Sequence, residues 1–158
     1  MKKILVMSLL FLSNIIFSMS KKPNLDVIDY IQYINRNLNI IMKYDYDDRL
    51  KVENVIIDIY SILDNGEHKR IISSYSDNLF LVNESGKMKM VISNAMLDKQ
   101  ANLNQRDLYQ VDIRIYSTMH IGWFEVYINK DGEKQIRVIS SNEISKIFKK
   151  MKQSKSEN

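Results

Sequence analysis

The chain of 158 residues contains no cysteine, carries a formal net charge of +4 and is 45% hydrophobic. This length suits one domain with one core, and the lack of cysteine excludes disulfides and thiolate chemistry. The net charge is too small to predict a nucleic-acid-binding protein.

The first twenty residues have the pattern of a secretory signal peptide. Lys2 and Lys3 form a basic start, an apolar run covers positions 4 to 17, and Ser18-Met19-Ser20 is a small-residue exit. The run is shorter than the roughly 20 residues that a membrane span needs. We therefore expect cleavage before Lys21 rather than a retained anchor. The predicted mature domain, residues 21–158, is periplasmic or secreted and has no transmembrane segment. Its charge is near +2, because two lysines are lost from +4.

Three helices are predicted in the first half of this domain. Apolar residues recur at helical spacing from Leu25 to Met42, from Val52 to Leu63 and, over a shorter length, from His68 to Tyr75. Gly66, in the sequence Asp64-Asn65-Gly66, is suited to end the second helix. We expect His68 to be a partly buried structural residue.

Strands dominate the second half. A hairpin is predicted from Leu79–Val82 and Lys87–Ile92, and a three-stranded antiparallel meander follows between positions 108 and 140. Apolar and polar residues alternate along each run of the meander, which predicts one buried and one solvated face. After a capping box at Ser140 to Glu143, a last amphipathic helix is expected, with residues 152–158 as a frayed basic tail.

The predicted fold class is therefore α+β: N-terminal helices packed on a curved antiparallel sheet, formed by the hairpin and the meander, with a C-terminal helix. The step Asn65-Gly66-Glu67 after a helix, the short helix and strand that follow it, and the closing hairpin at Asp131-Gly132 carry a resemblance. Over about residues 50 to 140 the order of elements resembles the cone-shaped nuclear transport factor 2-like superfamily. That resemblance implies a pocket on the helix-covered face of the sheet, where the enzymes of the superfamily place acid–base residues.

The two faces of the meander predict different roles. The buried face holds no carboxylate, histidine or tyrosine, so no catalytic residue is predicted there. Its residues are Val111, Ile113, Ile115, Phe124, Val126, Ile128, Ile136 and Val138. The other face mixes aromatic and paired charged side chains, as the centre of a protein interface does. Its binding candidates are Trp123, Tyr127, Tyr116, Asp112, Arg114, Glu125 and Arg137. With Trp123 at the centre, we expect a homodimer or another protein partner on this face.

No cofactor, metal or nucleic acid is predicted as a partner, because no phosphate loop, metal-ligand spacing or aromatic-basic platform occurs. His120 is expected to be an exposed turn residue. The sequence favours an exported, non-catalytic binding or assembly domain, acting through the outer sheet face or through a small apolar cone that could hold an apolar ligand. The alternatives are a small-molecule lyase or isomerase and a structural component of a cell-envelope or secretion assembly.

Overall fold

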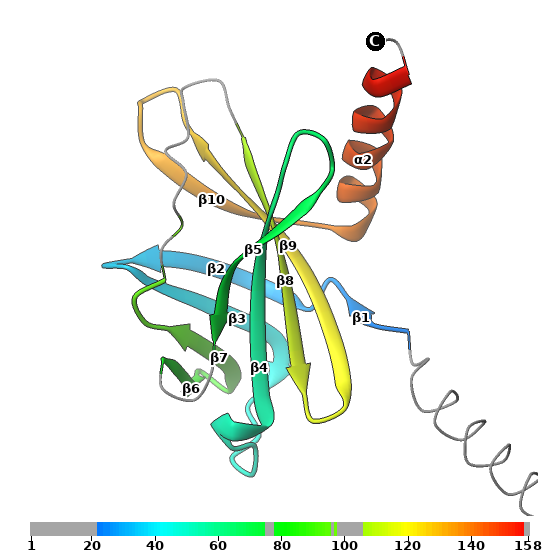
Figure 1. The fold of residues 1–158 in the computed structure, drawn as a ribbon. Coiled ribbons are helices and arrows are strands. Elements are labelled where there is room, and N and C mark those ends of the chain that lie inside the picture. The colour runs from blue at the N-terminus through cyan, green and yellow to red at the C-terminus, as the bar shows by residue number, and fades with distance from the viewer. Residues whose placement is uncertain (1–21, 75–77, 96, 98–105, 157–158) are drawn as a thin grey trace, which may run out of the picture.

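Two β-sheets and one long helix make up the computed structural model, which describes residues 22–74, 78–95, 97 and 106–156 (Figure 1). The first twenty residues, with the predicted signal peptide, lie outside this description. The elements in chain order are β1 (Asn24–Leu25), β2 (Ile28–Ile34), β3 (Asn37–Asp45), η1 (Val52–Asn54), β4 (Val55–Ile62), β5 (His68–Ser74), β6 (Leu79–Glu84), β7 (Lys87–Ile92), β8 (Asp107–Ile115), β9 (Thr118–Ile128), β10 (Lys134–Ile139) and α2 (Ser141–Ser156).

The six-stranded sheet is built around β9. Its strand order is β1-β9-β8-β4-β5, and β10 also pairs with β9. One edge of β9 pairs along its length with β8, while the other edge is shared: β1 runs parallel to His120 and Ile121, and β10 runs antiparallel to Trp123 through Ile128. The predicted antiparallel meander is therefore confirmed as β8, β9 and β10.

The four-stranded sheet has the order β2-β3-β7-β6, and its β6–β7 pair is the predicted hairpin. The strands of the two sheets cross one another in Figure 1. Their inner faces share one core, in which Ile57, Ile113 and Phe124 of the first sheet join Leu38 and Met90 of the second. The Phe124 ring stacks on Tyr109 with 4.8 Å between centroids. The face predicted to be buried is thus covered by a second sheet.

The predicted fold class is wrong, because the three expected N-terminal helices are strands. The first region forms the β2–β3 hairpin, the second forms η1 and β4, and the third forms β5. The helix order that underlies the resemblance to the nuclear transport factor 2-like superfamily is accordingly absent from the described residues. The space expected to be a cone beneath helices is filled by the side chains of the four-stranded sheet.

The predicted C-terminal helix is confirmed as α2. Its first turn is capped by Ser140, which directly precedes it, and by Asp26 from the first part of the described chain. The Ser140 hydroxyl accepts a hydrogen bond from the Glu143 amide at 3.2 Å, as the capping box requires. The Asp26 carboxylate accepts from the Ser141 amide at 2.5 Å and from the Ser141 hydroxyl at 2.6 Å. A negative charge there is favourable at the positive end of the helix dipole. The expected frayed tail is helical as far as Ser156, and 157–158 lie outside the described residues.

Candidate functional site

The seven predicted binding residues lie on or beside the outer face of the six-stranded sheet, and α2 crosses part of that face. Trp123 is only 7% exposed and packs with Leu108 and with Ile144 of α2. Its indole Nε1 donates a hydrogen bond to the Gln110 side-chain oxygen at 3.2 Å. The expectation of an exposed Trp123 is therefore wrong, because a helix of the same chain covers it.

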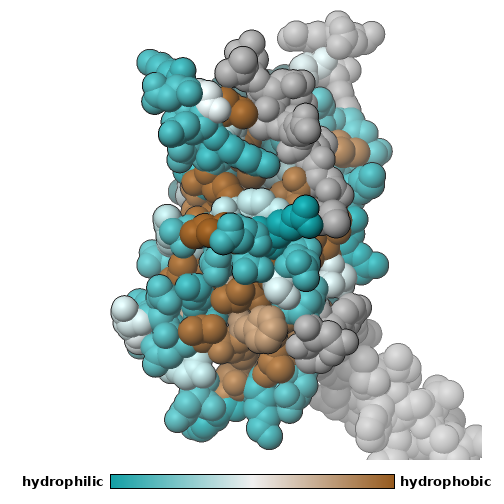
Figure 2. All heavy atoms as spheres, turned by 90° about the vertical axis from the view of Figure 1, so that its left-hand side faces the viewer, coloured by the Kyte–Doolittle hydropathy of each residue, from teal (hydrophilic) through white to brown (hydrophobic). Residues whose placement is uncertain are grey.

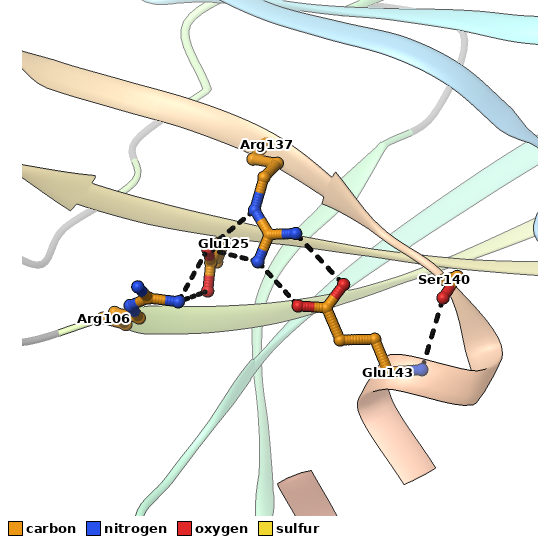
Figure 3. Close-up of polar contacts among 5 residues, drawn as sticks. All are labelled: Arg106, Glu125, Arg137, Ser140 and Glu143. Carbon is orange, nitrogen blue, oxygen red and sulfur yellow. Dashed lines mark hydrogen bonds and ion pairs between the residues drawn. The ribbon is translucent and has the colours of Figure 1, made fainter. Parts of the chain in front are cut away.

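Glu125 and Arg137 belong to a charge network that fixes α2 to the sheet (Figure 3). The Glu125 carboxylate, 1% exposed, accepts from the Arg137 guanidinium at 2.7 and 2.9 Å and from Arg106 at 3.3 Å. Arg137 also donates to Glu143 on α2 at 2.7 and 3.0 Å. The Arg137 guanidinium lowers the pKa of Glu143, and the two carboxylates raise the pKa of Arg137. These charged groups are paired within one chain, so they need no second protein to neutralise them.

The other predicted residues are spread over the rest of this face. Asp112 accepts from the Gln110 amide at 2.8 Å and lies opposite Asp58 of β4 in the sheet register. Burial, followed by the nearby Asp58 charge, raises the pKa of Asp112. The Arg106 guanidinium lies 5.9 Å over the Tyr127 ring. Arg114 and Tyr116 are exposed, and Tyr116 stands in the β8–β9 turn with a positive φ of 52°. Because Trp123 and Glu125 at the centre are buried, the seven residues do not form one exposed patch.

His120 lies on the core side of β9, 7% exposed, and not in an exposed turn as expected. Its ring makes an edge contact with Tyr44, with centroids 5.3 Å apart, and its Nδ1 is 3.4 Å from both the Tyr44 hydroxyl and the Asn24 amide. Burial lowers the pKa of His120. This arrangement is that of a neutral structural histidine.

The outer face of the four-stranded sheet exposes large apolar side chains that the sequence analysis did not single out. Phe80 is 52% exposed, and Tyr30 and Ile34 are 51% exposed each. Figure 2 shows the molecule from the left-hand side of Figure 1, where hydrophobic side chains lie among hydrophilic ones. We call the surface formed by the outward side chains of β2, β3, β6 and β7 the outer face of the four-stranded sheet.

Strand register orders this face into two cross-strand rows. One row runs Tyr30, Ile41, Lys89, Val82, and the other runs Gln32, Asn39, Val91, Phe80. Lys89 is the single charged residue of the two rows, and its ammonium group lies 3.2 Å from the Glu84 carboxylate. These two rows are therefore mainly apolar, and in the next row Lys87 is paired with Asp45 at 3.3 Å.

Sequence reasoning missed this face because β2 and β3 were predicted as a helix. The alternation of Tyr30, Gln32 and Ile34 along β2 was the available signal for a strand with one outward face. The β6–β7 strands were predicted, but without a partner hairpin their faces had no assignment.

The fold and this face define a two-sheet β protein. A helix covers part of the outer face of one sheet, and the outer face of the other sheet is exposed. No protein-family model matches the chain, and no curated protein matches it. Within the described residues, no group of three or more metal-ligating side chains is placed to hold an ion. None of the helices described there is long and apolar enough to cross a membrane.

Proposed function

We propose that this protein is an exported, non-catalytic assembly domain that pairs with a second copy of itself through the outer face of the four-stranded sheet. The observation that carries the proposal is the exposure of Phe80, Tyr30 and Ile34 on one sheet face. Exposed apolar patches with a polar surround usually mark contact sites. Aromatic residues are enriched, and charges depleted, at the centres of protein interfaces.

The charge and amide pattern favours a second copy as the occupant. Lys89 is neutralised by Glu84, so two such faces do not repel one another. Gln32 of the edge strand β2 and Asn39 of the neighbouring strand β3 stand side by side in one row, and an amide is both donor and acceptor. Such groups can complement themselves across a two-fold axis, as an isologous interface requires.

The contrast between the two sheets supports the same conclusion. On the six-stranded sheet, α2 covers Trp123 and its apolar neighbours. The four-stranded sheet leaves side chains of comparable size exposed, which costs solubility unless a partner covers them. Export is proposed from the leader sequence alone.

The test is sedimentation velocity of residues 21–158 from low micromolar to millimolar concentration. The wild type should dimerise, and Phe80→Glu should weaken the dimer by about 2 kcal/mol or more, because it places a charge at a buried anchor. Tyr116→Glu is the matched control, since Tyr116 is an exposed aromatic residue in the β8–β9 turn. It should leave the dimer unchanged.

A wild type that stays monomeric at the highest concentration would exclude self-pairing and leave a different protein as the occupant, as in a cell-envelope or secretion assembly. A dimer that Tyr116→Glu disrupts and Phe80→Glu leaves intact would place the interface on the other sheet.

A further inference from the structure

A pocket lies where the C-terminal half of α2 passes the β4–β5 turn, on the opposite side of the molecule from the face proposed for pairing. Its volume is about 320 Å³, within the range of about 300–1,000 Å³ that small-molecule sites occupy. Figure 1 shows α2 standing beside the β4–β5 hairpin. The pocket is lined by Asn65, Gly66, His68, Phe148, Met151 and Lys152.

The wall formed by the turn is held in place by its own hydrogen bonds. The Gly66 amide donates to the Leu63 carbonyl at 2.8 Å, and the Leu63 amide donates to the Glu67 carbonyl at 2.9 Å. Gly66 has a φ of +79°, which glycine adopts without strain, and a Cβ added there would meet nothing within 4 Å. A wall of this kind needs no ordering when a ligand binds, which favours affinity.

The wall formed by α2 is apolar and anchored. Phe148 and Met151 are half-buried members of the cluster that surrounds Trp123. The His68 ring stacks against Phe148 at a centroid distance of 6.0 Å and an interplanar angle of 26°. Phe148 and Met151 therefore give the helix side of the pocket an apolar lining.

The polar groups that line the pocket are able to donate hydrogen bonds. Lys152 brings an ammonium group, and His68 brings an imidazole. The Asn65 side-chain oxygen already accepts a hydrogen bond from the Glu67 amide at 2.9 Å. The Asn65 side-chain nitrogen is therefore the group that can donate to a ligand. None of the six lining residues is a carboxylate. An anionic group is the partner that such a set of donors fits.

We propose that this pocket binds a small amphipathic anion, a carboxylate with a short apolar body. The carboxylate lies between Lys152 and the Asn65 amide, and the apolar body lies against Phe148 and Met151. The site lies on the six-stranded sheet and α2, so it does not depend on the pairing of the other sheet.

The probe for the test is octanoate, added below its micellar concentration to residues 21–158 labelled with ¹⁵N. Amide shifts should saturate and centre on Gly66, His68 and Phe148. Trp123 is the single tryptophan of the chain and packs in the same cluster as Phe148, so its emission gives an independent readout. Octanol, with the same apolar body and no charge, should bind at least about tenfold more weakly, and octylammonium should bind more weakly still.

Three variants separate the site from general surface binding. Lys152→Gln should weaken octanoate binding about tenfold, whereas Lys149→Gln, an exposed neighbour on α2 that does not line the pocket, should leave it unchanged. Met151→Trp should fill the cavity and abolish binding while the far-ultraviolet spectrum stays that of wild type.

Shifts that are absent or scattered over the surface would overturn the proposal. So would octanol binding as tightly as octanoate, or Lys149→Gln weakening binding as much as Lys152→Gln. These outcomes are independent of sedimentation, because Phe80→Glu leaves every lining residue of the pocket unchanged.

Discussion

Glu125 and Asp112 are carboxylates on the outer face of the six-stranded sheet, and they differ in how well their charge is compensated. Glu125 is buried but has two arginines as partners, and a buried charge is tolerated only when it is paired and hydrogen-bonded. Asp112 is half-buried, its hydrogen bond comes from the neutral Gln110 amide, and another carboxylate, Asp58, stands opposite. The ionised form of Asp112 is therefore the disfavoured one.

We expect Asp112→Asn to stabilise the protein at neutral pH. Burial raises the pKa of Asp112 above its ordinary value of 3.8, so the folded state holds the proton more tightly than the unfolded state does. Stability from this group is present at low pH and is lost as pH rises through the folded pKa. The amide removes that loss and can still accept from Gln110. Chemical denaturation should give a higher free energy of unfolding for the variant at pH 7, and equal values where both states are protonated.

Asp47 provides the control with the opposite sign. The Arg49 side chain lowers the pKa of this exposed carboxyl, so Asp47→Asn should remove a small stabilisation that exists above the ordinary pKa and fades as pH falls. An Asp112→Asn variant that is less stable than wild type at pH 7 would mean that the carboxylate is better solvated than its surroundings imply.

At the scale of elements, β-bulges explain why strands were predicted as helices. Register shifts occur between Ile28 and Tyr30 in β2 and between Arg70 and Ile72 in β5, opposite Ile59 and Tyr60 of β4. A bulge moves the alternation on by one residue, so inward residues become three apart, as in a helix. Ile28 and Ile31 are both buried for this reason. The regular β8–β10 strands kept their period of two and were predicted correctly.

The β2–β3 turn also lacks the sequence pattern by which a hairpin is recognised. Asn35 and Arg36 both have positive φ, 52° and 63°, as a two-residue hairpin turn of the primed type needs. Such turns are recognised from sequence by Asn-Gly or Asp-Gly, and here arginine occupies the glycine position. The density of β-branched residues in Val55-Ile56-Ile57 favoured a strand, but the helical spacing of the apolar residues outweighed it in the prediction.

The position of α2 was not predictable from its own pattern, because an amphipathic helix does not specify which surface it covers.

The docking of α2 is open to a direct test through Ile144, which is 2% exposed and packs in the Trp123 cluster. Ile144→Asp would bury an unpaired charge in that cluster and should lower the free energy of unfolding by about 2–5 kcal/mol. Trp123 emission should shift to longer wavelength as the helix leaves the sheet. Ser145→Asp introduces the same charge on the adjacent exposed position and should change neither quantity. Unchanged emission in Ile144→Asp would place the cover of Trp123 elsewhere.

At the scale of the whole molecule, the start of the described chain is joined to its end. β1 adds Asn24 and Leu25 to the edge of β9, and Asp26 caps α2 through Ser141, 115 positions away. The same short segment leads into β2 of the other sheet. It therefore contacts the six-stranded sheet and the helix, and continues into the four-stranded sheet. The predicted cleavage site before Lys21 lies just ahead of it.

Cleavage at the proposed site before Lys21 removes residues 1–20 and retains Asn24 to Asp26. N-terminal sequencing of the exported product should give Lys21, and an intact Met1 in the membrane fraction would contradict the proposed signal peptide.

A chain begun at Val27 lacks the carboxylate that caps α2, a loss that typically costs about 0.5–2 kcal/mol. Leu25 is half-exposed, so little burial is lost with β1. Asp26→Ala in the chain begun at Lys21 should accordingly reproduce most of that loss in chemical denaturation. Equal stability of the chains begun at Lys21 and Val27 would show that the segment does not support the helix, and cleavage as far as Val27 would then be tolerated.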